Sequence, residues 1–433
     1  MLDPQHLRAE PELYREACRQ KGTAEPGRVD AWLAADQRRR ESQTAADALK
    51  ARQRVAGERM RDRALSEADR AALREELTAI KQQVQELEDR QRQAEADSAS
   101  IMLDLPALPD AAWPVGPDAS HNRVVRAWAD PQRPPQPLGE GGLDHISLAT
   151  NLRLADFERG VKIAGSRSYV LTGAGAMLHQ AVLRFAMDVL LGRGYTPFVV
   201  PVLVTQRCME GTGYFPAGRE QAYITQDGNT LVGTSEVALA SYHGEEMLPA
   251  GALPIRMCAV STCFRREAGA AGRDTAGLYR VHQFDKVEQV VIHAADTAEH
   301  VALHEEIIAN SEFILQALRL PYRVVQNCTG DMGQGKWRMY DIETWMPSRA
   351  EYCETHSGSA LRDFQARRLN LRYRERDEHG RETRPQFCYT LNNTAIASPR
   401  ILIPLLECYQ MTDGRVEVPE VLRPYMRGQD VLG

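Results

Sequence analysis

The segment from Phe264 to Glu288, "FRREAGAAGRDTAGLYRVHQFDKVE", carries residue types that could bind a multiply charged ligand. It holds four arginines, one histidine, one lysine and four carboxylates around a glycine-rich middle. Both ends alternate as strands do, so we expect strand, loop and strand, with residues two apart on one face. Arg265 and Glu267 would share a face of the first strand. The matching face of the second strand would carry Arg280, His282, Phe284, Lys286 and Glu288.

Such a face suits a planar, charged ligand better than a protein core. Guanidinium groups bind phosphates, an aromatic ring stacks on a base, and a carboxylate accepts hydrogen bonds from an amine or a hydroxyl. The alternative is a surface hairpin whose cross-strand ion pairs serve stability only. Taken alone, the segment leaves both interpretations open.

Three further stretches supply polar groups of complementary chemistry. "GTSEVAL" (233–239) places Thr234 and Glu236 on a turn between a strand-like run and a helical run. "ETHSGSALRDFQARR" (354–368) holds a carboxylate and a hydroxyl, Glu354 and Ser357, that could share a divalent cation. "LNNTAIASPR" (391–400) is predicted to place Asn392 and Thr394 late in a strand, and Arg400 in the first turn of the following helix.

The elements that position these residues fall into two regions, and the first is helical. Residues 28–98 contain one glycine and no proline. Two seams repeat every three to four residues, which predicts a long antiparallel helical hairpin. Ser66 is the predicted N-cap of its second helix. The seams are Ser42, Ala46, Leu49, Gln53, Ala56 and Met60, then Leu73, Leu77, Ile80, Val84 and Leu87.

The charge of this hairpin is divided unevenly between its two halves. Residues 28–63 hold ten Lys or Arg against six Asp or Glu, whereas residues 64–98 hold five against nine. The opposite excesses are compatible with two solvated helices that complement each other. They are equally compatible with an arm whose first helix contacts a phosphate backbone.

The second region follows a proline-rich connector, "MLDLPALPDAAWPVGPD" (102–118). Residues 194–204 are predicted to be buried β-structure interrupted by Pro197 and Pro201, and 300–320 and 401–410 to be helices. Short strands and helices that do not repeat as βαβ units favour an α+β fold with an antiparallel sheet. GxGxxG and GxxxxGK[ST] do not occur, so a Rossmann or P-loop nucleotide site is not supported.

Composition limits the cellular context. The 433 residues are 43% hydrophobic and 26% charged, with a net charge of −6. No apolar run approaches the roughly 18 residues of a membrane span, and the N-terminus lacks the pattern of a signal peptide. We therefore expect a cytoplasmic protein without membrane contact. The eight cysteines form no CxxC pair, so we expect free thiols and no zinc.

The ordered stretches resemble the signature motifs of class II aminoacyl-tRNA synthetases, and specifically the bacterial type of seryl-tRNA synthetase. "TSE", the 264–288 segment, "ETHSGSALRDFQARR", "LNNTAIASPR" and "VPEVLRPYM" occur in the order of that family, and "DQRRRE" and "LDLPALP" match near the arm. The resemblance covers essentially the whole chain. It implies an antiparallel catalytic sheet flanked by helices (111–433) and an N-terminal, tRNA-binding helical domain (1–110) with a coiled-coil arm.

The resemblance assigns nucleotide-binding roles. Arg265 would bind the α-phosphate of ATP and Arg280 the γ-phosphate, while Phe284 would stack on the adenine. Glu267 would lie on the base side, and Arg400 against the other face of the nucleotide. The residues assigned to ATP are Arg265, Glu267, Arg280, Val281, Phe284, Glu354, Thr355, His356, Ser357 and Arg400, with Arg265, Arg280 and Arg400 as catalytic cations.

It also assigns a serine pocket and a metal site. Glu288 and Thr394 would recognise the serine hydroxyl, and Glu354 and Ser357 would ligate Mg²⁺. Serine carboxylate attack on the α-phosphate needs cations and positioning, not a protein nucleophile. His282 and His356 are therefore expected to make structural hydrogen bonds. The serine-binding set is Thr234, Ser235, Glu236, Arg265, Glu288, Asn392 and Thr394.

The implied activity is ligation of L-serine to tRNA(Ser), with tRNA(Sec) as a further substrate, by a homodimer whose interface lies around Pro201. One alternative is a paralogue that activates serine and loads it onto a carrier protein or a small molecule. Another is a non-catalytic regulatory or RNA-binding protein. The arm argues against the first alternative, and the retained Arg265, Arg280, Glu354 and Arg400 argue against the second.

Overall fold

The computed structural model describes residues 1–269, 272 and 274–433. The chain forms two compact units, one of Leu2–Pro106 and one of Met1 with Ala107–Gly433. The first unit contains four helices, α1 (Pro4–Ala9), α2 (Pro11–Lys21), α3 (Gly27–Arg59) and α4 (Glu67–Asp104).

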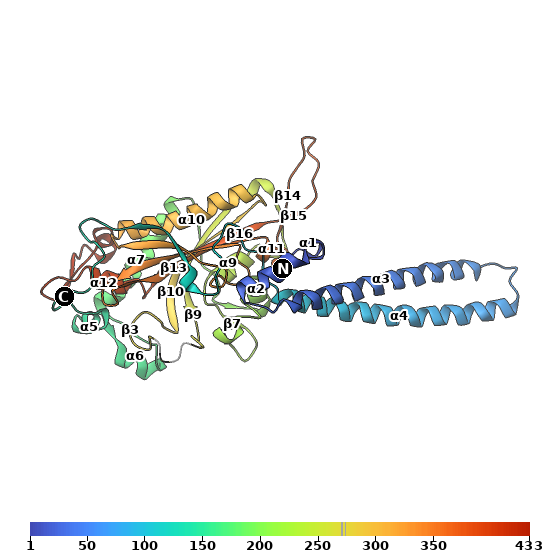
Figure 1. Ribbon diagram of the computed structural model, residues 1–433, viewed down its shortest axis with the longest axis horizontal. Coiled ribbons are helices and arrows are strands. Elements are labelled where there is room, and N and C mark those ends of the chain that lie inside the picture. Colours follow the sequence, from blue (N-terminus) through green and yellow to red (C-terminus); the bar gives the residue numbers. More distant parts are fainter. Residues whose placement is uncertain (270–271, 273) are drawn as a thin grey trace. The chain divides into compact units, whose positions relative to one another are not determined.

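The predicted helical hairpin is confirmed, since α3 and α4 pack side by side along their length (Figure 1). Leu73, Ile80 and Val84 are buried on α4, and small residues such as Ala46 and Ala56 are buried on α3. The side chain of Ser66 accepts a hydrogen bond from Asp69 N, as expected of an N-cap. The spacing of apolar residues is therefore sufficient to define this element.

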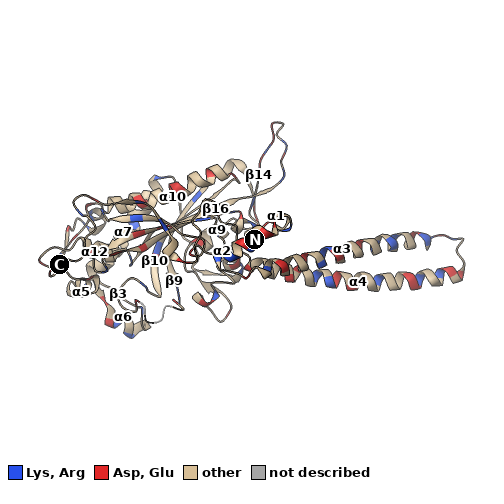
Figure 2. Cartoon of the chain, viewed as in Figure 1, with Lys and Arg blue, Asp and Glu red and all other residues tan. Residues whose placement is uncertain are grey.

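The charges of the two helices are partly paired with each other. Exposed ion pairs join Lys50 to Glu88 at 2.8 Å and Arg52 to Glu76 at 3.3 Å. Both signs occur along the hairpin (Figure 2). Exposed pairs of this kind contribute on the order of 0–1 kcal/mol each. In the described part of the chain, ion pairs are absent for four exposed arginines toward the tip, Arg54, Arg59, Arg61 and Arg63.

The second unit is built on an eight-stranded sheet with the order β1-β11-β12-β13-β16-β10-β9-β4. Every neighbouring pair is antiparallel except β4 and β9, which confirms the prediction of an antiparallel α+β core. The strands are β1 (Arg123–Trp128), β4 (Thr196–Phe198), β9 (Ile255–Phe264), β10 (Gln283–His293), β11 (Tyr322–Gln326), β12 (Arg338–Met346), β13 (Glu351–Arg362) and β16 (Tyr389–Ser398).

Two long helices pack on this sheet. Helix α10 (Thr297–Ala317) contacts β10, β13 and β16, and α7 (Gly173–Gly192) contacts β9, β10 and β16. Among the described residues α7 alone is long and apolar enough to cross a membrane by length and composition. However, 56% of that window is buried and it includes Arg184 and Asp188, so here it is a core helix.

Shorter elements complete the unit. The remaining helices are α5 (His145–Asn151), α6 (Phe157–Ala164), α8 (Gln206–Gly211), α9 (Glu236–Ser241), α11 (Phe364–Leu369) and α12 (Leu402–Cys408), with 3₁₀ turns at Ala119–His121, Arg219–Gln221, Ala250–Ala252 and Glu420–Met426. The remaining strands are β2 (Ala155–Asp156), β3 (Val170–Leu171), β5 (Leu203–Val204), β6 (Tyr223–Ile224), β7 (Thr230–Leu231), β8 (Met247–Pro249), β14 (Arg372–Arg374), β15 (Gln386–Phe387), β17 (Val416–Glu417) and β18 (Val431–Leu432).

The predicted strand limits around the charged segment were too wide. β9 ends at Phe264 and β10 begins at Gln283, so Arg265, Glu267, Arg280 and His282 lie in the connection. Glu267 has a φ of 52°, which leaves the extended region. The His282 amide donates to Arg167 O at 3.2 Å. Part of the intervening loop, residues 270, 271 and 273, lies outside the described residues.

Three other expectations are corrected. Residues 194–204 do form interrupted β-structure, as β4 and β5, but the prediction that this segment is buried is wrong, because β4 lies at the edge of the sheet and Val199 is fully exposed. Pro197 and Pro201 limit strand pairing there. Arg400 lies in the turn before α12, not in its first turn, and Asn392 and Thr394 lie in the middle of β16. The prediction of free thiols is confirmed for all eight cysteines.

Candidate active site

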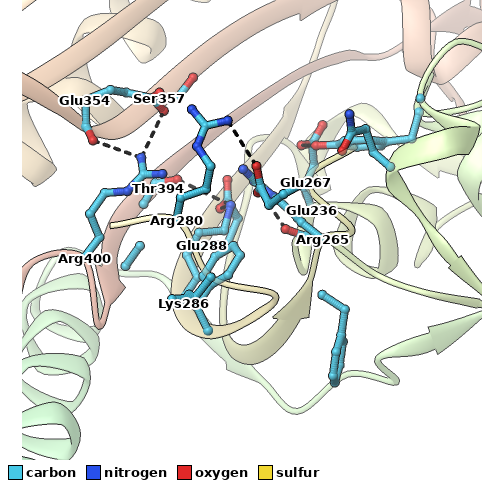
Figure 3. Close-up of a pocket in the computed structure, with 18 of the residues that line it drawn as sticks. Glu236, Arg265, Glu267, Arg280, Lys286, Glu288, Glu354, Ser357, Thr394 and Arg400 are labelled. Carbon is cyan, nitrogen blue, oxygen red and sulfur yellow. Dashed lines mark hydrogen bonds and ion pairs between the residues drawn. The ribbon is translucent and has the colours of Figure 1, made fainter. Parts of the chain in front are cut away.

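A cavity of about 490 Å³ opens where β10, β13 and β16 meet the connection that follows β9 (Figure 3). The antiparallel register brings together residues from segments that are distant in sequence. Of the sequence-predicted site residues, the cavity is lined by Glu236, Arg265, Glu267, Arg280, Val281, Phe284, Glu288, Glu354, Thr355, Ser357, Asn392, Thr394 and Arg400.

Lys286, Glu288 and Thr394 form one wall of the cavity. Glu288 on β10 is paired in register with Thr394 on β16, and its side chain forms an ion pair with Lys286. Lys286 Nζ also donates to Thr394 Oγ1 at 3.4 Å. Burial raises the pKa of Glu288, and the neighbouring Lys286 opposes that rise. The wall therefore presents a buried carboxylate, an ammonium and a hydroxyl within one strand pair.

Glu236, at the start of α9, is a second buried carboxylate on the same cavity. It accepts hydrogen bonds from Tyr214 Oη at 2.7 Å, Gln365 Nε2 at 2.7 Å and Asn392 Nδ2 at 2.8 Å. Burial and the adjacent Glu236 raise the pKa of Tyr214 well above its usual value, so the phenol stays a donor. This end of the cavity therefore carries two carboxylates, Glu236 and Glu288, and one ammonium group, Lys286. The excess negative charge suits an ammonium ligand.

Three guanidinium groups line the cavity elsewhere. Arg265 lies over the ring of Phe284 at 5.2 Å, and Arg280 is 3.4 Å from the Glu267 carboxylate. Arg400 donates through Nη1 to Glu354 O at 2.9 Å. Arginine forks and an aromatic face in one cavity are typical of sites that bind phosphates and a base.

Oxygen donors cluster on β13 beside Arg400. Glu354 and Ser357 both line the cavity, and Ser357 is paired in register with Asp341 on β12. Asp341 accepts from Asn327 Nδ2 at 2.7 Å, while its Oδ1 is buried without a hydrogen-bond partner in the described structure. Burial and the nearby Glu354 raise the pKa of Asp341. No group of three or more His, Cys, Asp or Glu arranged for a metal occurs among the described residues.

Three of the predicted site residues, Thr234, Ser235 and His356, do not line the cavity. Thr234 Oγ1 accepts a hydrogen bond from the Glu236 amide at 3.2 Å, and Ser235 is buried beside it. His356 is buried and hydrogen-bonded to Thr355 Oγ1 at 2.8 Å, and burial lowers its pKa to about 3. His282 Nδ1 donates to Arg265 O at 3.0 Å. Both histidines thus make hydrogen bonds within the protein.

Sequence reasoning assigned no role to several residues that form the site. Lys286 lies on the alternating face of the second strand, so its position could have been found from period two alone. Tyr214, Gln365 and Asp341 come from other segments and carry no local signal. Tertiary contacts bring Tyr214 into the lining of the cavity and place Gln365 and Asp341 behind the lining residues Glu236 and Ser357.

Comparisons with known proteins agree with this architecture. The seryl-tRNA synthetase N-terminal domain matches residues 1–109, and the tRNA synthetase class II core domain (G, H, P, S and T) matches residues 223–409. The serine–tRNA ligase of Deinococcus radiodurans is 43% identical over 100% of this chain and 99% of its own.

Two solved structures are similar over nearly the full length. The seryl-tRNA synthetase of Pyrococcus horikoshii complexed with ATP has a TM-score of 0.92 and 34% identity, covering 100% of this chain and 99% of its own. The cytoplasmic serine–tRNA ligase of Naegleria fowleri in complex with AMP has a TM-score of 0.85 and 30% identity, covering 98% and 95%. The chain therefore belongs to the seryl-tRNA synthetase family of class II aminoacyl-tRNA synthetases.

Proposed function

We propose that this protein activates L-serine with ATP and transfers the seryl group to tRNA(Ser). The observation that carries the proposal is one cavity that joins a buried acidic end, Glu236 and Glu288, to three guanidinium groups. The acidic end suits the ammonium and hydroxyl of serine. The cationic part suits a triphosphate, in keeping with relatives whose structures hold ATP or AMP.

In the first step, a serine carboxylate oxygen attacks the α-phosphorus of ATP and the bond to pyrophosphate breaks. In the second, a terminal tRNA hydroxyl attacks the seryl carbonyl, and AMP leaves. Attacking and leaving groups are anionic in the first step, so fixed cations supply most of the rate. We assign Arg265 to the α-phosphate, Arg280 to the γ-phosphate and Arg400 to the nucleotide face.

The remaining nucleotide contacts are assigned by position. Phe284 stacks on the adenine, with Glu267 on the base side. The Phe284 ring already lies against the guanidinium group of Arg265. An aromatic face set among polar groups favours a flat ligand. Val281 and Thr355 also line the cavity, and His356 contributes from behind Thr355.

Serine selectivity rests on Glu288 and Thr394, with Asn392 and Glu236 for the ammonium group. Thr234, Ser235 and Arg265 complete the proposed pocket. A site built to hydrogen-bond a hydroxyl rejects alanine, because its buried polar groups would be left unpaired. Threonine must be excluded by the shape of the cavity.

The donor chemistry beside Arg400 fits Mg²⁺. Glu354 and Ser357 offer few protein oxygens on an open wall, which leaves positions for water and substrate oxygens. Asp341 lies behind Ser357 with its pKa raised by burial and by Glu354, and a bound cation would favour its ionised form. When bound, the ion supplies charge neutralisation on the phosphates. Glu354 and Ser357 would hold it.

The helical hairpin α3–α4 is proposed to bind tRNA. Arg54, Arg59, Arg61 and Arg63 are exposed and lack ion pairs within the described residues, so they can neutralise phosphates. The same arm is proposed to accept tRNA(Sec). Because its substrates are ATP and tRNA, we assign the protein to the cytoplasm. The exposed Val199 beside Pro201 supports a homodimer through this face.

The proposal is tested by serine-dependent exchange of labelled pyrophosphate into ATP, followed by charging of bulk tRNA with labelled serine. Exchange with serine, well above exchange with alanine or threonine, is expected. Folded protein that gives no exchange with any amino acid would exclude the activity. Exchange without charging of tRNA would instead favour the alternative, a paralogue that loads serine onto a carrier protein or a small molecule.

A further inference from the structure

The connection between Asp274 and His282 is held by residues outside the cavity. Arg167, a buried residue between α6 and β3, donates through Nη1 to Asp274 O at 3.0 Å and to Arg280 O at 3.3 Å. Its own carbonyl accepts from the His282 amide at 3.2 Å. The backbone near both ends of this short segment is therefore held by one residue, Arg167. The orientation of the side chains in the segment is left to other contacts.

Arg349, in the turn between β12 and β13, makes two of those contacts. Its Nη2 donates to Asp274 Oδ1 at 2.5 Å. Its guanidinium carbon lies 4.2 Å from the centroid of the Tyr279 ring. Arg400 approaches the same ring at 4.4 Å and donates through Nε to Tyr279 O at 3.0 Å. Tyr279 thus links Arg349 to Arg400.

Asp274 faces a second guanidinium group besides Arg349. Arg280 Nε is 4.0 Å from Asp274 Oδ2, and Arg280 Nη1 is 3.4 Å from Glu267. Charge-assisted hydrogen bonds weaken steeply with distance, so Arg349 holds Asp274 much more strongly than Arg280 does. A carboxylate already neutralised by Arg349 competes less with an anionic ligand for Arg280.

We propose that Arg349 is a positioning residue of the nucleotide site, which acts by holding Asp274 and the Tyr279 ring so that Arg280 and Arg400 remain directed at the ligand. Arg349 does not line the cavity, so its effect passes through these neighbours. The inference rests on the proposed function, because that function assigns Arg280 and Arg400 to ATP.

Kinetics of exchange with four variants test the proposal. Arg349→Met is expected to raise the KM for ATP about tenfold, because a charge-assisted hydrogen bond and a cation–π contact are lost. The KM for serine and the melting temperature stay close to the wild type. Arg349→Lys keeps the charge and is expected to recover part of the loss. Asp274→Asn raises the KM for ATP, and the double variant Arg349→Met/Asp274→Asn is no worse than Arg349→Met alone.

A matched control is Arg323→Met. Arg323 also pairs with an acid, Glu343, and lies 5.1 Å from a tyrosine ring, Tyr352, but outside the cavity. It is expected to leave the KM for ATP unchanged. The proposal is overturned if Arg349→Met leaves that KM unchanged. It is also overturned if the KM for serine and the melting temperature shift together with it, or if the two single effects add in the double variant.

Failure of this inference differs from failure of the proposed function. Wild-type protein without serine-dependent exchange would contradict the function. In that case, calorimetric titration with a non-hydrolysable ATP analogue still measures whether Arg349→Met weakens nucleotide binding about tenfold. Equal affinity of the two proteins for the analogue would overturn the positioning role. A wild type that exchanges normally, beside an Arg349→Met variant with an unchanged KM for ATP, would overturn the positioning role alone.

Discussion

The two carboxylates at the acidic end of the cavity are buried in different ways. Glu236 is held by three neutral donors, whereas Glu288 is paired with the ammonium group of Lys286. Neutral donors fix the geometry of Glu236 without cancelling its charge. The lysine offsets the charge of Glu288, which lowers the cost of keeping it ionised in a buried site. One net negative charge therefore remains for the ligand.

Substitution of Glu288 tests this arrangement. Glu288→Gln is expected to lower kcat/KM for serine about 10- to 100-fold, because a charge-assisted hydrogen bond to the substrate is lost. The free energy of unfolding should fall by about 3 kcal/mol, since Lys286 is left without a counter-charge. Exchange assays at varied serine and urea denaturation provide the two measurements.

The double variant Glu288→Gln/Lys286→Met is the control for that experiment. It removes the unpaired ammonium, so it should regain most of the lost stability while serine activation stays low. A folded Glu288→Gln variant with wild-type kcat/KM for serine would contradict the assignment of Glu288 to the amino-acid pocket.

At the scale of elements, α10 presents buried imidazoles to the sheet. His304 Nε2 lies 3.2 Å from Gly358 O on β13, and His300 lies 2.7 Å from His293 on β10. Burial lowers the pKa of His304 to about 4, and burial with the neighbouring His293 lowers that of His300 to about 2. Both rings are therefore neutral in the folded protein at neutral pH.

A pH dependence of stability follows. The unfolded chain binds a proton on His304 below about pH 6.5, whereas the folded chain binds it only below about pH 4, so stability is lost as the pH falls between these values. Each such histidine contributes about 1.4 kcal/mol per pH unit within its window. His304→Gln should reduce the slope of unfolding free energy against pH by about that amount between pH 6 and 4.5.

Urea denaturation at several pH values, followed by circular dichroism, measures this slope. His379→Gln, on the exposed loop between β14 and β15, is a matched substitution away from the core. An unchanged slope in His304→Gln would show that His304 does not titrate differently in the two states.

At the scale of the whole molecule, the chain separates into a helical unit that carries the hairpin and a catalytic unit with its own core. The cavity is lined entirely by residues of the second unit. Contacts with a large polyanion require exposed cations, which the hairpin supplies in Arg54, Arg59, Arg61 and Arg63. Activation of serine and recognition of tRNA should therefore be separable.

Replacement of residues 28–98 by a short linker should spare serine-dependent exchange and abolish the charging of tRNA(Ser). Exchange within the same preparation is the control for folding of the catalytic unit. Charging that survives at the wild-type rate would mean that the hairpin does not carry the tRNA interaction.

From the exposed edge around β4 we predict that the protein forms a homodimer. The protein is expected to sediment at about twice the 48.4 kDa of one chain. Val199→Asp places a charge on the fully exposed valine and should shift the protein toward a monomer. Analytical ultracentrifugation of both proteins decides this, and an unshifted Val199→Asp dimer would place the interface elsewhere.

The sequence by itself determined the features that depend on spacing along one segment. Leu73, Ile80 and Val84 define the helical seam, Ser66 caps α4, and period two aligns Phe284, Lys286 and Glu288 on β10. Local periodicity specifies which side chains share a face, because backbone geometry repeats within an element. The order of the motifs also identified the family, which the relatives confirm.

Only the tertiary structure decided what meets at the cavity. Tyr214 and Gln365 converge on Glu236, and Arg349 reaches Asp274, from segments with no pattern in common. The hydrogen bond from the His282 amide to Arg167 O, just before β10, and the exposure of Val199 beside the edge strand β4 also depend on the tertiary structure. Contacts between distant segments are set by packing and register, which leave no local signature in the chain.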